Sequence, residues 1–131
     1  EKDYAVYIQT MKGSYPTNDH IQLGTRKLAY ETAAGKVILA FQSASNHHDS
    51  YKEIHTIQAN RFAIYEKQNV MEIAVPVYKN DTDVIASPNK TSDTNRVTRR
   101  MQKHYIFLLQ HAANELRKIV QLRKGERIGT T

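Results

Sequence analysis

A regular spacing of apolar residues in the last third of the chain constrains the fold more than any other feature. From residue 97 onward, apolar side chains recur every three or four positions, the spacing that places them along one side of an α-helix. The residues of this stripe are Val97, Met101, Tyr105, Leu108, Leu109, Ala112, Ala113, Leu116 and Ile119. The pattern predicts a long amphipathic helix that begins at Arg96, ends at residues 120–122 and takes its N-cap from residues 93–95.

The net charge of +6 is concentrated in the same part of the chain. Residues 1–95 carry ten basic and eleven acidic residues, a net charge of −1, whereas residues 96–131 carry nine basic and two acidic ones, a net charge of +7. A basic excess often indicates a nucleic-acid-binding surface. Because the excess here belongs to one helix and its tail, a solvated helix face is the competing interpretation.

The rest of the chain reads as short strands and two further helices. Strands are expected at residues 4–9, 20–23, 61–65, 70–78 and 84–86, with irregular chain at 24–31 and Pro88 interrupting the last strand. Helices are expected at residues 32–42, with Thr32 as N-cap, and at residues 50–60. Since turn-linked, antiparallel strands dominate, the predicted class is α+β.

Several function classes are excluded by composition or lack a signal. The chain has no cysteine, which excludes disulfides, cysteine-ligated metals and thiol catalysis. No motif for a catalytic nucleophile or a phosphate-binding loop is present, so we expect no enzyme activity and no cofactor. No window is apolar enough to cross a membrane, and no signal peptide is recognisable at the N-terminus. We therefore expect an excised part of a larger cytoplasmic protein with no membrane partner.

Three histidines and an aspartate form a group of metal-capable side chains in the middle of the chain. His47, His48 and Asp49 are adjacent, and His55 follows on the next predicted helix. Neighbouring histidines cannot easily share one ion, and the loop is otherwise polar. An accidental surface cluster is the preferred interpretation, and no metal site is expected.

Two stretches in order resemble the effector-binding domain of the IclR-type bacterial transcription regulators. The first is Leu23-Gly24-Thr25-Arg26-Lys27-Leu28, followed by Thr32-Ala33-Ala34-Gly35-Lys36-Val37-Ile38-Leu39-Ala40. The second is Ile73-Ala74-Val75-Pro76-Val77-Tyr78, followed after a turn and a strand by Arg96-Val97-Thr98, the Ala112-Ala113 pair and Glu115. The resemblance covers roughly residues 4–120. It implies a GAF-like or profilin-like antiparallel sheet flanked by helices and ending in the long C-terminal helix.

The resemblance also implies where an effector binds. Members of the family line their pocket with the small-residue start of a helix, here Ala33, Ala34 and Gly35. Unpaired N–H groups at a helix N-terminus attract anions, and small side chains let a carboxylate approach them, although packing against the sheet explains the same residues. Further pocket walls are expected at Glu66, Glu72, Asn89 and Thr91. In a pocket, the Glu72 carboxylate would repel an acidic effector or recruit a cationic one. An exposed strand face is the preferred interpretation of this residue.

The resulting hypothesis is a ligand-sensing and oligomerisation domain at residues 1–122 with a flexible basic tail at 123–131. The family implies a small-molecule effector, expected to be an organic acid, a homodimer or homotetramer, and DNA binding through a winged helix-turn-helix domain that this chain does not include. Two alternatives stay open: a degenerate assembly domain that senses nothing, and a small basic nucleic-acid-binding module.

Overall fold

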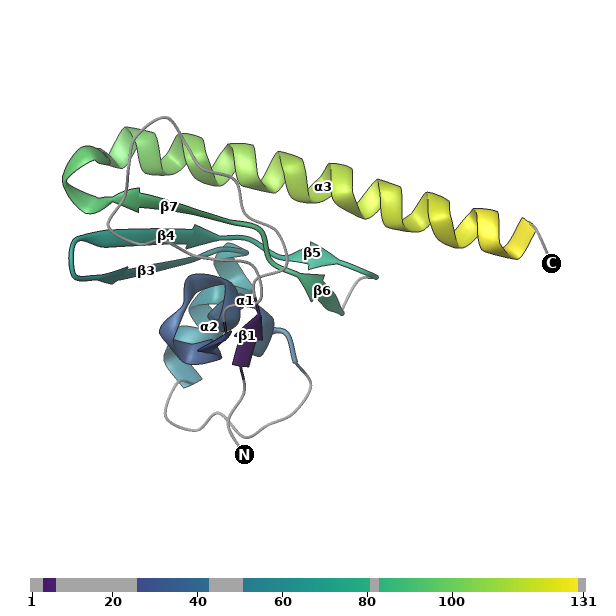
Figure 1. Ribbon diagram of the computed structural model, residues 1–131, viewed down its shortest axis with the longest axis horizontal. Coiled ribbons are helices and arrows are strands. Elements are labelled where there is room, and N and C mark those ends of the chain that lie inside the picture. Colours follow the sequence, from purple (N-terminus) through teal and green to yellow (C-terminus); the bar gives the residue numbers. More distant parts are fainter. Residues whose placement is uncertain (1–3, 7–25, 43–50, 81–82, 130–131) are drawn as a thin grey trace.

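The computed structural model describes residues 4–6, 26–42, 51–80 and 83–129, and their backbone forms an α+β fold (Figure 1). The elements, in chain order, are β1 (Tyr4–Val6), β2 (Arg26–Leu28), the 3-10 helix η1 (Ala29–Glu31), α1 (Ala33–Ala40), α2 (Tyr51–Asn60), β3 (Ala63–Lys67), β4 (Val70–Ala74), β5 (Val77–Tyr78), β6 (Val84–Ala86), β7 (Asn89–Asp93), the 3-10 helix η3 (Thr94–Arg96) and α3 (Arg99–Gly129). The predicted class, an antiparallel sheet flanked by helices and followed by a long C-terminal helix, is confirmed. No described helix is long and apolar enough to cross a membrane.

The central sheet has three antiparallel strands in the order β3-β4-β7. A tight turn joins β3 to β4, and both of its central residues have positive φ: 50° at Gln68 and 65° at Asn69. This is the backbone conformation of a two-residue hairpin turn, whose twist matches that of the flanking strands. The turn fixes the register of β3 on β4, and with it the face of the sheet to which each side chain points.

The predicted strand at 84–86 is confirmed as β6, whereas the predicted strand at 70–78 is confirmed in part, because it is interrupted after Ala74. β4 ends at Ala74 and β5 begins at Val77, while the return chain pairs with β5 as β6 and with β4 as β7. Across the break, the Val75 N–H donates to the carbonyl of Pro88 at 3.2 Å, and the Ser87 hydroxyl donates to the Val75 carbonyl at 2.9 Å. Pro88 therefore marks the point where the return strand changes partners, as a residue without an N–H is expected to do.

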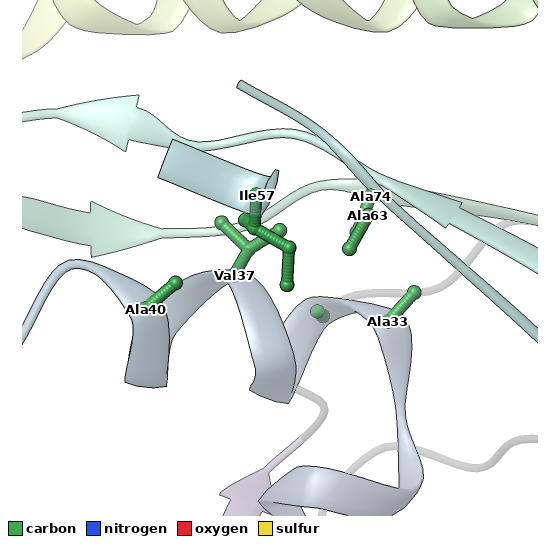
Figure 2. Close-up of a cluster of buried hydrophobic side chains, with 7 residues drawn as sticks. Ala33, Val37, Ala40, Ile57, Ala63 and Ala74 are labelled. Carbon is green, nitrogen blue, oxygen red and sulfur yellow. The ribbon is translucent and has the colours of Figure 1, made fainter. Parts of the chain in front are cut away.

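Two layers of helix enclose the central sheet. Figure 1 shows α1 and α2 on one side of it and α3 running along the other. A cluster of mostly small buried residues joins α1 and α2 to the sheet (Figure 2): Ala33, Ala34, Val37, Ala40, Ile57, Ala63 and Ala74. Because successive side chains of a strand point to opposite faces, Ala74 and Glu72 share the α1 face while Met71 and Ile73 point to the α3 side.

The start of α1 is held by its predicted N-cap and by a close backbone contact. The Thr32 hydroxyl accepts a hydrogen bond from the Gly35 N–H at 2.8 Å, which confirms Thr32 as the cap. One turn earlier the chain forms η1, and an added Cβ on Gly35 would lie 2.1 Å from the carbonyl oxygen of Ala29. The absence of a side chain at Gly35 is therefore required for the packing of η1 on α1.

Residues 26–28, expected as irregular chain, are a strand instead. β2 pairs antiparallel with β1, with Tyr4 opposite Leu28 and Val6 opposite Arg26. The segment has two basic residues out of three, and its own strand propensity is low, so the pairing with a β-rich partner decides its conformation. The strand expected at residues 20–23 and the loop at 43–49 lie outside the described residues.

The long helix is confirmed, but both of its predicted ends are wrong. Its first turn is capped by Thr98, whose hydroxyl accepts from the Met101 N–H at 3.2 Å, while Asp93 caps η3. At the other end the helix continues to Gly129, so residues 123–129 extend it and do not form the separate tail expected after Leu122. A single glycine in a helix interior costs only about 1 kcal/mol relative to alanine, and the neighbouring residues are mostly good helix formers.

Only a narrow part of the apolar stripe on α3 is covered by the described residues. Ala113 is buried, and Leu109 packs with it against Val75 and Val77. The exposed apolar residues of the same helix are Phe107, Leu108, Leu116, Ile119 and Leu122. A stripe that follows i, i+3 and i+4 spans a wide arc of the helix, and the sheet contacts one edge of that arc.

Tyr78 lies among aromatic and basic groups from elements on both sides of the sheet. Its ring packs edge-on against Phe41 at the end of α1, with 5.5 Å between ring centroids, and the Arg61 guanidinium lies 5.8 Å from its centroid. The carbonyl of Arg61 accepts from the Gln110 side chain of α3 at 3.4 Å. Burial raises the pKa of the Tyr78 phenol, an effect that Arg61 and Arg117 oppose.

We predict that Gly35→Ala destabilises the fold by roughly 2–3 kcal/mol, because the new methyl group collides with the η1 backbone and one of the two must move. The free energy of unfolding in urea measures the effect. At an unobstructed helical position the same substitution would stabilise by up to about 1 kcal/mol, and a gain of that size would refute the packing role.

Candidate ligand-binding face

The N-terminus of α1 faces the middle of strand β4, and a buried side chain connects the two. The Ala33 N–H, the first of the helix, donates to Oε1 of Glu72 at 3.1 Å, although the two residues are 39 positions apart. Glu72 is 4% exposed and Ala33 has no exposed surface. The carboxylate thus lies at the positive end of the helix dipole and satisfies an N–H that the helix itself leaves without a partner.

The register of the sheet brings three of the predicted wall residues to the α1 face. Glu72 is paired with Thr91 of β7 on one side and with Tyr65 of β3 on the other, and Asn89 is paired with Ala74. Directly opposed residues of an antiparallel pair point to the same face of the sheet. Thr91 and Asn89 are half-buried. The predicted association of Glu72, Asn89 and Thr91 with the small-residue helix start is therefore present as an arrangement in space.

Glu66 does not join this group. It is paired with Met71, which points to the α3 side, and Glu66 is exposed. The expectation that Glu66 lines the same face as Glu72 is wrong because six positions along the chain include a two-residue turn, so spacing alone does not fix the face. The opposite expectation for Glu72, an exposed strand face, is also wrong, because the residue is buried under α1.

The geometry changes what the small residues at the helix start can do. Ala33, Ala34 and Gly35 are all buried, and Gly35 is explained by its contact with Ala29. The Ala33 N–H, expected to donate to the carboxylate of a ligand, donates to the carboxylate of Glu72 instead. The site as arranged already contains one buried acid beside neutral hydrogen-bonding side chains.

Two residues of this face were not anticipated from the sequence. Tyr65 is the strand neighbour of Glu72, and the Lys36 ammonium lies 4.7 Å from the centroid of the Tyr65 ring. Lys36 also forms an ion pair with Glu53 of α2. The alternation of side chains along a strand predicts that Tyr65 lies on the same face as Ala63 and Lys67. The contact of Tyr65 with Lys36, in contrast, depends on how α1 lies across the sheet.

Most of the metal-capable cluster expected from the sequence cannot be placed relative to this face. His47, His48 and Asp49 lie outside the described residues, and His55 is exposed on α2. Among the residues that the structure describes, no three histidine or acidic side chains lie close enough together to hold a metal ion.

Comparison with known proteins relates the chain to bacterial transcription regulators. The Pca operon regulatory protein of Acinetobacter baylyi is 27% identical over a 124-residue alignment, with a coverage of 76% of this chain and 45% of that protein. The IclR protein of Thermotoga maritima has a similar structure, with a TM-score of 0.80 at 20% identity over 89% of this chain and 57% of that one. The inducer-binding domain of the Acinetobacter transcription factor PobR, a double mutant in complex with 3-hydroxybenzoic acid, has a TM-score of 0.66 at 20% identity over 87% and 86% of the two chains.

These similarities show the fold of the effector-binding domain of IclR-type regulators, as the sequence resemblance predicted. The chain spans about half the length of the Pca operon regulatory protein and of the Thermotoga protein. No protein-family model matches it. The similar proteins are transcription regulators and not enzymes, which agrees with the expectation of no catalytic activity.

We predict that Glu72→Ala lowers the free energy of unfolding by about 1–3 kcal/mol at neutral pH, because it leaves the buried Ala33 N–H without its acceptor. Glu66→Ala is the matched control, since it removes the same side chain from an exposed position on the other face of the sheet and should change stability by less than about 0.5 kcal/mol. Urea unfolding of both variants compares them. Equal losses would show that the contact with Ala33 contributes nothing.

Proposed function

We propose that this chain is the ligand-sensing and oligomerisation domain of a transcription regulator. In this proposal a small organic metabolite binds on the α1 face of the sheet and modulates operator binding by an attached winged helix-turn-helix domain. The observation that carries the proposal is the half-buried, uncharged pair Asn89 and Thr91 beside the α1 N-terminus. A few neutral hydrogen-bonding groups next to a buried apolar cluster are typical of small-molecule sites. The double mutant of the PobR inducer-binding domain, which has a similar fold, binds 3-hydroxybenzoic acid.

Strand β4 offers a direct connection between ligand and assembly. Its Glu72 points to the α1 face, while Met71 and Ile73, both buried, point to the side on which α3 lies. A ligand that displaces β4 or β7 therefore also changes the support under α3. The exposed apolar residues of α3 supply a surface on which copies of the chain could pair, in a homodimer or a homotetramer. Ligand binding would then shift the relative orientation of protomers, which is the coupling that regulation of DNA binding requires.

An assembly domain that senses nothing is the second candidate, and one observation favours it. The N-terminus of α1, where the family resemblance places a ligand, is bonded to Glu72 and packed against η1. In that case α3 would serve pairing alone.

A thermal-shift screen separates the two candidates. We expect at least one compound from a panel of aromatic acids including 3-hydroxybenzoate, their amides, amino acids and sugars to raise the melting temperature, since a ligand bound only by the folded state adds about 2.7 kcal/mol at a concentration of 100 times Kd. No shift with any compound would favour the assembly domain.

The position of the ligand is tested by a pair of neighbouring variants. Thr91→Val removes a hydroxyl from the proposed ligand face, and Ser92→Ala removes one from the opposite face, where Ser92 is paired with Met71. The stabilising compound should bind at least about tenfold more weakly to Thr91→Val if it hydrogen-bonds that hydroxyl, and with unchanged affinity to Ser92→Ala. Isothermal titration calorimetry measures both. A reversed pattern would place the ligand elsewhere.

A further inference from the structure

We infer that Glu72 is an internal ligand of this domain: its carboxylate occupies the anion-binding position at the N-terminus of α1, so an effector meets that position with an uncharged or cationic group and not with a carboxylate. The inference rests on the proposed function, because it names the chemical class of ligand that the α1 face selects. It concerns the chain's own carboxylate, and that carboxylate is seen bound at the position in question.

The N–H groups at the start of α1 are nearly all engaged within the chain. The Ala33 N–H donates to Glu72, the Gly35 N–H to the Thr32 hydroxyl at 2.8 Å, and the Lys36 N–H to the Thr32 carbonyl at 3.0 Å. A second carboxylate would have to displace one of these acceptors. All three donors belong to a segment in which Thr32 and Ala33 have no exposed surface.

Charge opposes a second carboxylate as strongly as geometry does. A carboxylate of a ligand about 4 Å from that of Glu72 would be repelled by enough to weaken binding about a hundredfold or more in the partly buried setting of this face. An amide, hydroxyl or ammonium group, in contrast, can donate a hydrogen bond to Glu72.

Chemical rescue tests whether the position is a carboxylate site that Glu72 fills. Glu72→Ala removes a CH2–COO⁻ group, which acetate replaces almost atom for atom, and acetamide is the uncharged analogue of the same shape. We expect acetate to raise the melting temperature of Glu72→Ala by about 2–6 °C relative to sodium chloride at the same ionic strength, when its concentration is near ten times its Kd. Acetamide should give less than half of that shift.

The wild-type protein and Glu66→Ala are the controls, and acetate should stabilise neither of them more than chloride does. Stabilisation of the wild type equal to that of Glu72→Ala, or no difference between acetate and acetamide in the variant, would overturn the inference. If Glu72→Ala does not fold, Glu72→Gln keeps an acceptor oxygen for the Ala33 N–H while removing the charge. In that variant the affinity for benzoate should rise at least tenfold, while the affinity for benzamide changes less than threefold; equal changes would overturn the inference.

The rescue is independent of the natural effector, so the two proposals can fail separately. If acetate rescues Glu72→Ala but no metabolite stabilises the wild type, Glu72 is an internal ligand in a domain that does not sense. If metabolites bind the wild type through a carboxylate that shifts the Ala33 amide resonance, the sensing function stands and the role inferred for Glu72 is wrong.

Discussion

The close approach of α1 to the central sheet is the constraint on which the rest of the structure depends. It is possible because alanine and glycine occupy the contact: Ala33 and Ala74 have no exposed surface, and Gly35 accommodates the Ala29 carbonyl. A larger residue at any of these positions would lift the helix from β4. The Glu72 carboxylate reaches the first N–H of α1 only because that distance is short.

Local signals were sufficient to predict most of the helical structure. Thr32 followed by a run of small and apolar residues correctly located α1, and the spacing of apolar residues located α3. The predicted ends of α3 are wrong because a single glycine, Gly125, does not outweigh its helix-forming neighbours, and because Thr98 competes with three other residues suited to capping. Each of these differences is decided by about 1 kcal/mol.

The residues of the candidate site could be proposed from the sequence, but the face of the sheet on which each of them lies could not. Glu66 and Glu72 are equally plausible from the sequence, yet the turn at Gln68 and Asn69 sends them to opposite faces of the sheet. A strand register is a property of two segments together, so no window along one segment reveals it. The bond between Glu72 and Ala33 joins residues 39 positions apart and likewise follows from the packing of α1, not from any local pattern.

The length of α3 has a mechanical consequence. At 31 residues the helix is about 46 Å long, and Figure 1 shows it extending past the end of the sheet. A rigid rod held near its middle, as α3 is through Leu109 and Ala113, amplifies rotation: a tilt of about 5° displaces a point about 25 Å along the axis by about 2 Å. Small shifts of the β4 side chains that break no contact can therefore move the far end of the helix by as much as an interatomic distance.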